Sequence, residues 1–399
     1  MPMPRRIDHY LKDLLDEERF AFYSQVAEFA EEKIAPRVLA LERAHELVPQ
    51  DLIKEMGEFG LFGLPIATEY DGQGGGQLEL VLMGLALSYW SQSMAITPGA
   101  ATSLGSKPLM LFGNEAQKRE HLPDLAKGKR MFVFGLSEPG RGSDAANPEV
   151  VAVRDGSGWV LRGEKCWSTN ARWASHVVVH AMTDPSGRRG HRSTCFIVPM
   201  NAPGVSYNEM GGKVVWRLSS TGSIAFDSVR VDDAAILGAV NDGFKVMATT
   251  LNGGRLFVAA LAVGSAAFAL DRVRAYAQER QQFDDKPIGR FQRVQDVVVD
   301  LDIAVEQSIT WLLHLVGLYD QNRLEREQAA KVKIAISQRV SELMLDAMEV
   351  CGGVACLDEF GLMRHHEDLF VTRVGEGSNR ALRTQVAQSL LPDIRTLLQ

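Results

Sequence analysis

The chain has 399 residues, of which 46% are hydrophobic and 23% are charged, and these values are typical of a globular protein with more than one domain or subdomain. A formal net charge of -7, with no clustered basic stripe, argues against a nucleic-acid-binding surface. We find neither a signal peptide nor a segment that we expect to cross a bilayer, and we therefore expect a cytoplasmic protein. Cys166, Cys195, Cys351 and Cys356 form no CxxC pair, which argues against a disulfide framework or a zinc ribbon.

The spacing of apolar residues in the first third of the chain predicts helices. In "ERFAFYSQVAEFAEEKIAPRVLA", Phe22, Val26 and Phe29 share one helical face before Pro36 interrupts the pattern. The segment "YDGQGGGQ" is a turn, and "ELVLMGLALSYW" is apolar nearly all round, as in a buried helix. We predict an N-terminal helical domain over residues 1–128.

Runs of strand-favouring residues in the middle of the chain predict a sheet. "VVAVRDGSGWVLRG" reads as two strands joined by a hairpin turn at Asp155-Gly156-Ser157-Gly158, and "HVVVHAMTD" and "STCFIVPM" predict further strands. We predict a β-barrel or sandwich domain over residues 129–238. Long helical patterns then return, so the fold class is mainly α with a central β domain, and residues 239–399 form a C-terminal four-helix bundle with oligomer contacts.

Common metal and nucleophile motifs are absent from the sequence. His365 and His366 are adjacent, whereas metal ligands on a helix are usually three or four residues apart, so we expect surface or packing roles and no metal site. There is no HExxH, no GxSxG and no GxxxxGK[ST], and "GQGGGQ" lacks the spacing of a dinucleotide fingerprint. A bound nucleotide cofactor would therefore be held without a Rossmann turn.

Three other segments carry possible binding chemistry. "FGLSEPGRGSD" is a loop rich in backbone and hydroxyl donors, and "GEKCWSTNA" places Trp167 beside two hydroxyls, which suits a flat heteroaromatic ring. "VGEGSN" sets Glu376 between two glycines, as in a turn built around a ligand. Each piece alone also fits a plain turn, a core tryptophan or an ordinary helix connection.

Together with "YAQERQQFDDKPIGRFQ" and "EVCGGVACLDEFGLMRHHEDLFVTRVGEGSN", these segments closely resemble the acyl-CoA dehydrogenase family over almost the whole chain. The resemblance implies bound FAD and α,β-dehydrogenation of an acyl thioester, in which a base removes the α proton and the β hydrogen leaves as hydride to flavin N5. By position, Glu376 is that base, and its own backbone N–H bonds the thioester carbonyl. Partial burial would raise the pKa of such a carboxylate and make it a stronger base.

The resemblance also implies the other site residues. For the flavin and the thioester arm they are Phe134, Leu136, Ser137, Gly142, Ser143, Trp167 and Thr169. For the adenosine diphosphate half of an FAD in a neighbouring subunit they are Arg280, Phe283, Gln292, Glu349, Gly352, Gly353 and Ser378. For the substrate they are Ser143, Arg255, Gly375 and Gly377, where Arg255 also fits ordinary surface ion pairing. Sharing of one FAD by two chains implies a homo-oligomer, a dimer or tetramer, and the expected electron acceptor is an electron-transferring flavoprotein.

The sequence departs from the family pattern at several positions. Gly254 stands where some members carry the catalytic acid, so Glu376 has no competitor. Gly375 stands where an aromatic residue is more common, and we expect a wider pocket and a branched, cyclic or bulky acyl group. Asp284, Glu349, Glu367 and Ala171 are further departures, and the first two add negative charge near the expected pyrophosphate and adenine path. The segment "SMAITPGAATS" fits a roomy pocket floor but equally fits close helix packing.

The sequence leaves three alternatives open. The acyl group could be attached to a carrier protein rather than to CoA. The same scaffold could support a flavin monooxygenase or nitroalkane oxidase, although those relatives generally lack a glutamate at this position. A non-catalytic homologue would purify colourless.

Overall fold

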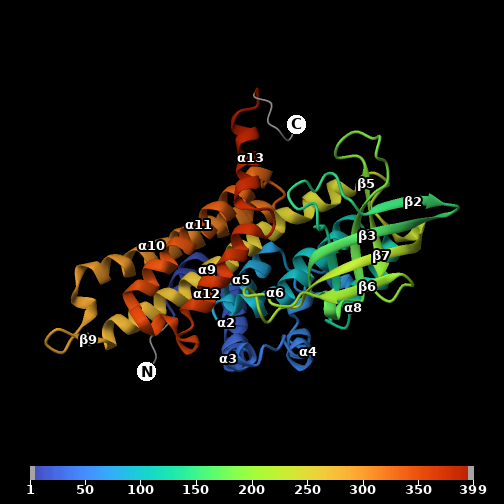
Figure 1. Cartoon of the computed structure of the whole chain (residues 1–399). Coiled ribbons are helices and arrows are strands. Elements are labelled where there is room, and N and C mark those ends of the chain that lie inside the picture. Colours follow the sequence, from blue (N-terminus) through green and yellow to red (C-terminus); the bar gives the residue numbers. More distant parts are fainter. Residues whose placement is uncertain (1–4, 394–399) are drawn as a thin grey trace.

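The structure is a computed structural model that describes residues 5–393. Figure 1 shows helices, then a sheet, then helices along the chain, and this order confirms the predicted architecture. The N-terminal helices are α1 (Arg6–Leu14), α2 (Glu17–Phe29), α3 (Ala35–Ala44), α4 (Gln50–Glu58), α5 (Gln77–Ser88), α6 (Gln92–Ala100), α7 (Lys107–Phe112) and α8 (Glu115–Ala126).

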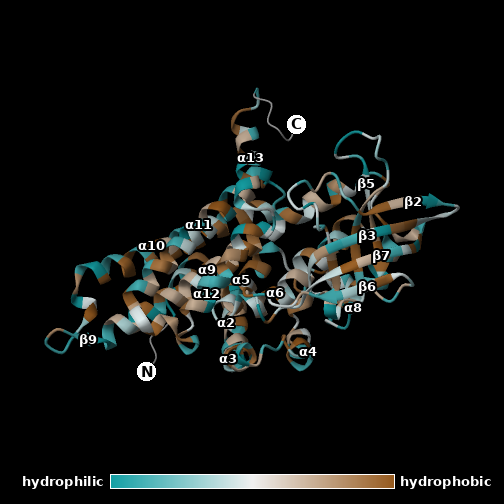
Figure 2. Cartoon of the chain, in the orientation of Figure 1, coloured by the Kyte–Doolittle hydropathy of each residue, from teal (hydrophilic) through white to brown (hydrophobic). Residues whose placement is uncertain are grey.

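Pro36 does not end the helical path, contrary to the expected interruption. A π-helical turn, Ala30–Ile34, joins α2 to α3. Pro36 lies in the first turn of α3, directly after this π-helical turn, at a position where proline is favoured. The predicted buried helix is confirmed as α5, whose residues are buried around most of its circumference. Figure 2 shows hydrophobic residues throughout the region where the N-terminal helices meet the bundle.

The middle of the chain forms one 8-stranded sheet with the strand order β6-β7-β3-β2-β4-β5-β8, and β1 pairs with β4 off this path. The predicted hairpin is confirmed, because β2 pairs antiparallel with β3 across residues 156–157. The strands are β1 (Phe132–Gly135), β2 (Val151–Asp155), β3 (Gly158–Thr169), β4 (His176–Met182), β5 (Ser193–Pro199), β6 (Val205–Glu209), β7 (Thr221–Asp232) and β8 (Ile236–Leu237).

The two faces of this sheet are buried in different ways. On one face, strands β3 and β7 share a core with β4 and β5, so the sheet folds over its own apolar side chains. On the other face, Phe132 and Ile197 join a second core with Leu109 of α7 and Leu125 of α8. The sheet is therefore docked on the helices, and the loop that follows β1 lies beside this junction.

The C-terminal helices pack around one long central helix, α9, which also lies against α5. The elements are α9 (Gly243–Glu279), β9 (Gln281–Gln282), β10 (Lys286–Pro287), α10 (Gln292–Asp320), α11 (Arg326–Cys351), the 3-10 turn Gly352–Cys356, α12 (Leu362–Val374) and α13 (Asn379–Leu390).

Our expectation that no segment has the length and composition of a membrane span is wrong for two helices. Both α9 and α10 are long and apolar enough by these criteria alone. In α9, 89% of the most apolar window is buried inside the structure, against 44% in α10. The apolar character of α9 therefore matches its central place in the protein core.

Candidate active site

Glu376 lies in the short connection between α12 and α13 and has left-handed backbone angles, with φ at 54°. This conformation costs a non-glycine residue about 1–2 kcal/mol. Gly377 follows with φ at +92°, so it is needed for the turn. Gly375 has φ at -65° and ψ at 156°, which any residue adopts, so its lack of a side chain is not required by the backbone.

The Glu376 carboxylate is enclosed although the turn itself is only half-buried. It packs against Gly254 of α9 so closely that a Cβ placed on Gly254 would meet Glu376 Oε2 at 2.7 Å. Oε2 is buried and has no hydrogen-bond partner. Burial raises the pKa of Glu376 to about 7, while the nearby charges of Arg255 and Lys333 act in the opposite direction. An unpartnered carboxylate in this state is a competent base near neutral pH.

Arg255 holds the backbone of the turn. Its Nε donates a hydrogen bond to the carbonyl oxygen of Glu376 at 3.2 Å, and its Nη1 donates to Asn252 Oδ1 at 3.0 Å. The side chain is buried, and this burial lowers the pKa of Arg255 to about 10. The alternative of surface ion pairing is therefore wrong for Arg255.

Lys333 of α11 reaches the same turn and was not singled out by the sequence. Its Nζ is fully buried and donates to the carbonyl oxygen of Gly377 at 2.9 Å and to Asn379 Oδ1 at 3.0 Å. A helical signal was available, because Ala329, Lys333 and Ser337 follow each other at intervals of four and all three are buried. The spacing places this lysine on the inner face of α11.

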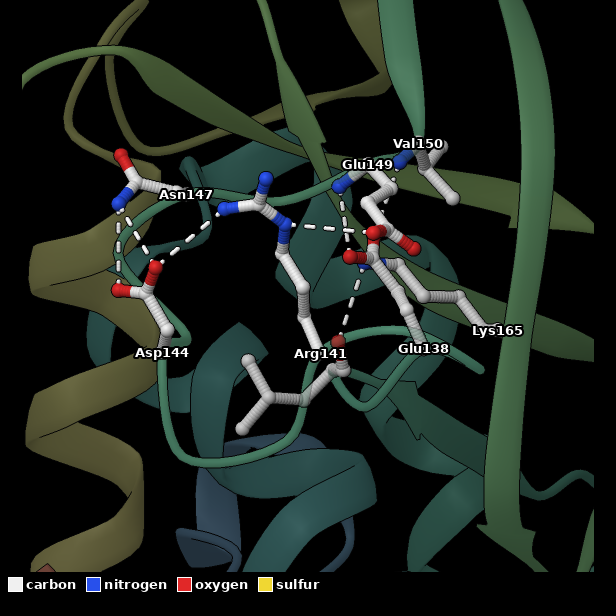
Figure 3. A network of polar contacts seen from close by, with 8 residues as sticks. Glu138, Arg141, Asp144, Asn147, Glu149, Val150 and Lys165 are labelled. Carbon is white, nitrogen blue, oxygen red and sulfur yellow. Dashed lines mark hydrogen bonds and ion pairs between the residues drawn. The ribbon is translucent and has the colours of Figure 1, made fainter.

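The loop between β1 and β2 is held by a buried ion pair (Figure 3). Lys165 Nζ of β3 lies 2.6 Å from Glu138 Oε1, and it also donates to the carbonyl oxygen of Leu136 at 3.1 Å. Glu138 accepts further hydrogen bonds from the backbone N–H groups of Glu149 and Val150. Both residues lie in the segments quoted above, but nothing in the sequence shows that two residues 27 positions apart pair.

Trp167 stands at a β-bulge beside this loop. The register of β3 against β7 shifts between Lys165 and Ser168, and Trp167 has φ at 59°. Its side chain is 64% exposed, so the alternative of a core tryptophan is wrong. The bulge turns the ring outward while its neighbours Cys166 and Ser168 stay buried.

The predicted flavin residues of the middle domain come together around this bulge. Cys166 N–H donates to the carbonyl oxygen of Ser137 at 2.9 Å, which joins the loop to the bulged strand. Phe134 and Leu136 pack partly buried against the second core, Thr169 ends β3, and Gly142 and Ser143 are exposed on the loop. A Cβ on Gly142 would meet nothing within 4 Å, so open space adjoins the loop backbone.

The second group of predicted cofactor residues lies elsewhere. Arg280 precedes the β9–β10 hairpin and Phe283 lies in its turn, and Figure 1 shows this hairpin at the opposite end of the molecule from the sheet. Phe283 is 75% exposed. The other members, Gln292, Glu349, Gly352 and Gly353, are also exposed, whereas Ser378 caps the N-terminus of α13 by accepting from Ala381 N–H. One chain therefore does not bring the hairpin residues of this group to the middle domain.

These features fit a flat, phosphorylated cofactor such as FAD. An exposed indole, the buried and unpartnered hydroxyl of Ser168 and a glycine loop with free space adjoin one another in the middle domain. Within residues 5–393 no cluster of three potential metal ligands exists. His365 is buried and its Nδ1 lies 2.9 Å from Ser265 Oγ, which is the packing role expected for it.

The segment expected at the pocket floor is buried, but its small residues are used for packing. A Cβ on Gly99 of α6 would meet the ring of Phe257 at 2.2 Å, and a Cβ on Gly84 of α5 would meet it at 2.9 Å. Phe257 of α9 thus fills the space between two helices. Among the sequence departures, Glu367 forms an ion pair with Arg217, with Nη2 and Oε2 2.6 Å apart.

Three domain models of one protein family match successive parts of the chain. Models described as acyl-CoA dehydrogenase N-terminal, middle and C-terminal domains match residues 16–129, 133–229 and 241–391. A probable acyl-CoA dehydrogenase of Bacillus subtilis (strain 168) is 36% identical over 377 residues, which cover 94% of this chain and 99% of that protein.

Solved structures show the same likeness. The butyryl-CoA dehydrogenase of Megasphaera elsdenii superposes with a TM-score of 0.90 at 30% identity and covers 94% of this chain and 99% of its own. A glutaryl-CoA dehydrogenase of Mycobacterium smegmatis in complex with FADH2 has a TM-score of 0.90 at 27% identity and covers 96% of both chains. The chain belongs to the acyl-CoA dehydrogenase family, a family of FAD-dependent oxidoreductases that act on acyl-CoA.

Proposed function

We propose that this chain catalyses α,β-dehydrogenation of an acyl-CoA and that Glu376 is the base that removes the α proton. The observation that carries the proposal is the enclosed Glu376 carboxylate, whose Oε2 has no partner and whose pKa is raised to about 7 by burial. Such a carboxylate can accept a proton from the substrate carbon without first losing a hydrogen bond.

The backbone of the same residue supplies the second requirement. Removal of an α proton places negative charge on the thioester oxygen, which needs donors. Within residues 5–393 the N–H of Glu376 donates no hydrogen bond. We assign this N–H to the thioester carbonyl. When bound, FAD supplies the acceptor for the β hydrogen as hydride and a ribitol hydroxyl as a second donor.

The residues that hold FAD are proposed in two groups. Phe134, Leu136, Ser137, Gly142, Ser143, Trp167 and Thr169 hold the flavin half, and Ser143, Arg255, Gly375 and Gly377 line the thioester. Arg280, Phe283, Gln292, Glu349, Gly352, Gly353 and Ser378 hold the adenosine diphosphate half of the FAD of another subunit. The separation of the β9–β10 hairpin from the sheet supports a shared cofactor and therefore a homo-oligomer, which we propose to be a tetramer.

For the acyl group we propose a branched, cyclic or otherwise bulky chain near the reacting carbons. The support is Gly375, whose backbone angles any residue adopts. A Cβ at this position would meet only Val371 within 4 Å, with the Val371 carbonyl oxygen at 3.1 Å, so the missing side chain leaves space next to Glu376. The Megasphaera elsdenii relative is named for butyryl-CoA, a short straight-chain thioester, so this proposal separates the chain from that relative. We further propose electron-transferring flavoprotein as the acceptor and a cytoplasmic location.

The test is an anaerobic titration of the purified yellow protein with straight, branched and cyclic acyl-CoA thioesters, with and without Glu376→Gln. We expect the variant to lose flavin reduction by roughly 10²–10⁴-fold because general-base catalysis contributes that much. The parent rate should rise with pH through about 7, since only the deprotonated carboxylate accepts a proton. Glu342→Gln, an exposed acid on α11, is the matched control and should reduce its flavin like the parent.

Each alternative has its own readout in this experiment. Equal rates for Glu376→Gln and the parent would show that the base is misassigned. Bleaching of the flavin by acyl-carrier-protein thioesters but not by acyl-CoA would favour the carrier-protein substrate, and substrate-coupled oxygen uptake would favour a monooxygenase. Strict preference for short straight chains would contradict the bulky acyl group.

A further inference from the structure

We propose that Lys333 is a positioning residue for the Glu376 base and that it forms, with Arg255, a two-sided clamp on the catalytic turn. This inference rests on the proposed function, because it assigns Lys333 a task in presenting the base. The two cations approach the turn from different helices, Arg255 from α9 and Lys333 from α11.

The clamp acts on two successive carbonyl oxygens. Arg255 Nε binds the oxygen of Glu376 at 3.2 Å, and Lys333 Nζ binds the oxygen of Gly377 at 2.9 Å. These are the residues with φ at 54° and +92°, so the clamp holds the part of the turn with unusual backbone angles. Charge-assisted hydrogen bonds are about twice as strong as neutral ones and can hold such a conformation.

The lysine is itself held in place from the far side. Its Nζ also donates to Asn379 Oδ1 at 3.0 Å, and Asn379 Nδ2 donates to Ser337 Oγ of the same α11 at 2.9 Å. Lys333, Ser337 and Asn379 are all buried. A three-residue network therefore fixes where the ammonium points, and the first residue of α13 is part of it.

The turn in this position determines where the carboxylate lies. The peptide unit that directly follows Glu376 carries the oxygen bound by Arg255, and the next one carries the oxygen bound by Lys333. The Glu376 side chain between this turn and α9 lies against Gly254 with almost no spare room. A rotation of this turn would move both the carboxylate and the N–H assigned to the thioester carbonyl. Misplacement of a catalytic group by about 1 Å can cost a factor of roughly 100 in rate.

Charge adds a second effect of the clamp. The charged groups that act on Lys333 are Glu376 in the turn, Arg255 on α9 and Arg373 on α12. Burial lowers the pKa of Lys333 to about 7, with Glu376 raising it and the two arginines lowering it further. In return, a positive Lys333 lowers the pKa of Glu376. Loss of the ammonium should therefore move the Glu376 titration to higher pH.

The experiment compares the holoenzyme with Lys333→Met and Lys333→Gln in anaerobic flavin reduction by acyl-CoA across pH 6–9. For Lys333→Met we expect a flavin reduction rate about tenfold to a hundredfold lower, since the turn loses its clamp. We also expect the acidic limb of the pH–rate profile, where the rate rises with pH, to shift upward by about one pH unit. Lys333→Gln can still donate to the Gly377 oxygen, so we expect the same upward shift with most of the rate retained.

A lysine that only stabilises the fold would give a different pattern. It would lower thermal stability and flavin content but leave the limb at the parental pH when rates are taken per bound flavin. Lys331→Met, on the same helix but only partly buried, is the control and should keep the parental limb. If Lys333→Met and Lys333→Gln both keep the parental limb and rate, the clamp is wrong. If the parent itself fails to reduce its flavin with any acyl-CoA, the proposed function fails instead.

Discussion

At the scale of single residues, the decisive contact is the one between Gly254 and Glu376. The carboxylate fills the place that a side chain at position 254 would take, with Oε2 2.7 Å from the site of a Cβ. Glycine in the middle of a helix destabilises it by about 0.5–1 kcal/mol, so α9 carries a stability cost at this point. We infer that the cost makes room for the base.

This contact predicts the behaviour of Gly254→Ala. The helix backbone accepts alanine, but the new methyl group forces the carboxylate to move by several tenths of an ångström, so we expect flavin reduction to slow roughly tenfold to a hundredfold with bound FAD unchanged. Gly317→Ala in α10 is the control, because nothing lies within 4 Å of its added methyl group. Unchanged kinetics for Gly254→Ala would show that the carboxylate has room elsewhere.

The sequence identified the residues at the site that belong to contiguous motifs. Glu376, Gly375 and Gly377 were read from one six-residue segment, and Trp167 from another. Lys333 was missed because a lysine in a long helix is ordinarily a surface residue, and its burial depends on α13 folding back over α11. Gly377 owes its identity to backbone angles, whereas Gly375 does not, and only coordinates separate the two.

At the scale of elements, the loop after β1 depends on the buried pair between Glu138 and Lys165 (Figure 3). Burial lowers the pKa of Lys165, and the Glu138 carboxylate opposes this effect. The Glu138 carboxylate also accepts the N–H groups of residues 149 and 150, so it joins the start of the loop to its end. Removing one partner leaves the other charge buried and unpaired.

We therefore expect Lys165→Met to lower the free energy of unfolding by about 3–5 kcal/mol and to reduce FAD retention, because the loop carries the proposed flavin contacts. Chemical denaturation and the flavin absorbance per chain measure the two effects. The exposed pair of Arg154 with Asp233 in the same domain provides the control, and Arg154→Met should cost less than about 1 kcal/mol. Equal effects of the two substitutions would contradict the special role of the buried pair.

Helices and strands were predicted well where periodicity was strong, as in α5, α9 and the β2–β3 hairpin. The π-helical turn before α3 was not predicted, because a proline within an apolar pattern ordinarily ends a helix and only packing shows that the chain continues. The bulge at Trp167 was also missed, since alternation along β3 does not reveal an inserted residue.

At the scale of the whole molecule, the sheet and the β9–β10 hairpin lie at opposite ends (Figure 1). The sheet carries the flavin group, and the β9–β10 hairpin carries part of the other. Apolar side chains are also exposed on the bundle: Val299 and Ile303 of α10 are 52% and 46% exposed and stand four residues apart, on the same face. Both observations favour association of two or more copies through the bundle.

This arrangement predicts that assembly and FAD retention fail together. Ile303→Glu places a charge on the exposed apolar face of α10, where burial against another subunit would leave it unpaired, so we expect a smaller molecular mass by light scattering and less bound flavin per chain. Val153→Glu, at an equally exposed apolar residue of β2, is the control and should keep the parental mass and flavin. A parental mass for Ile303→Glu would exclude this face from the interface, and a smaller species with full flavin would show that one chain binds FAD alone.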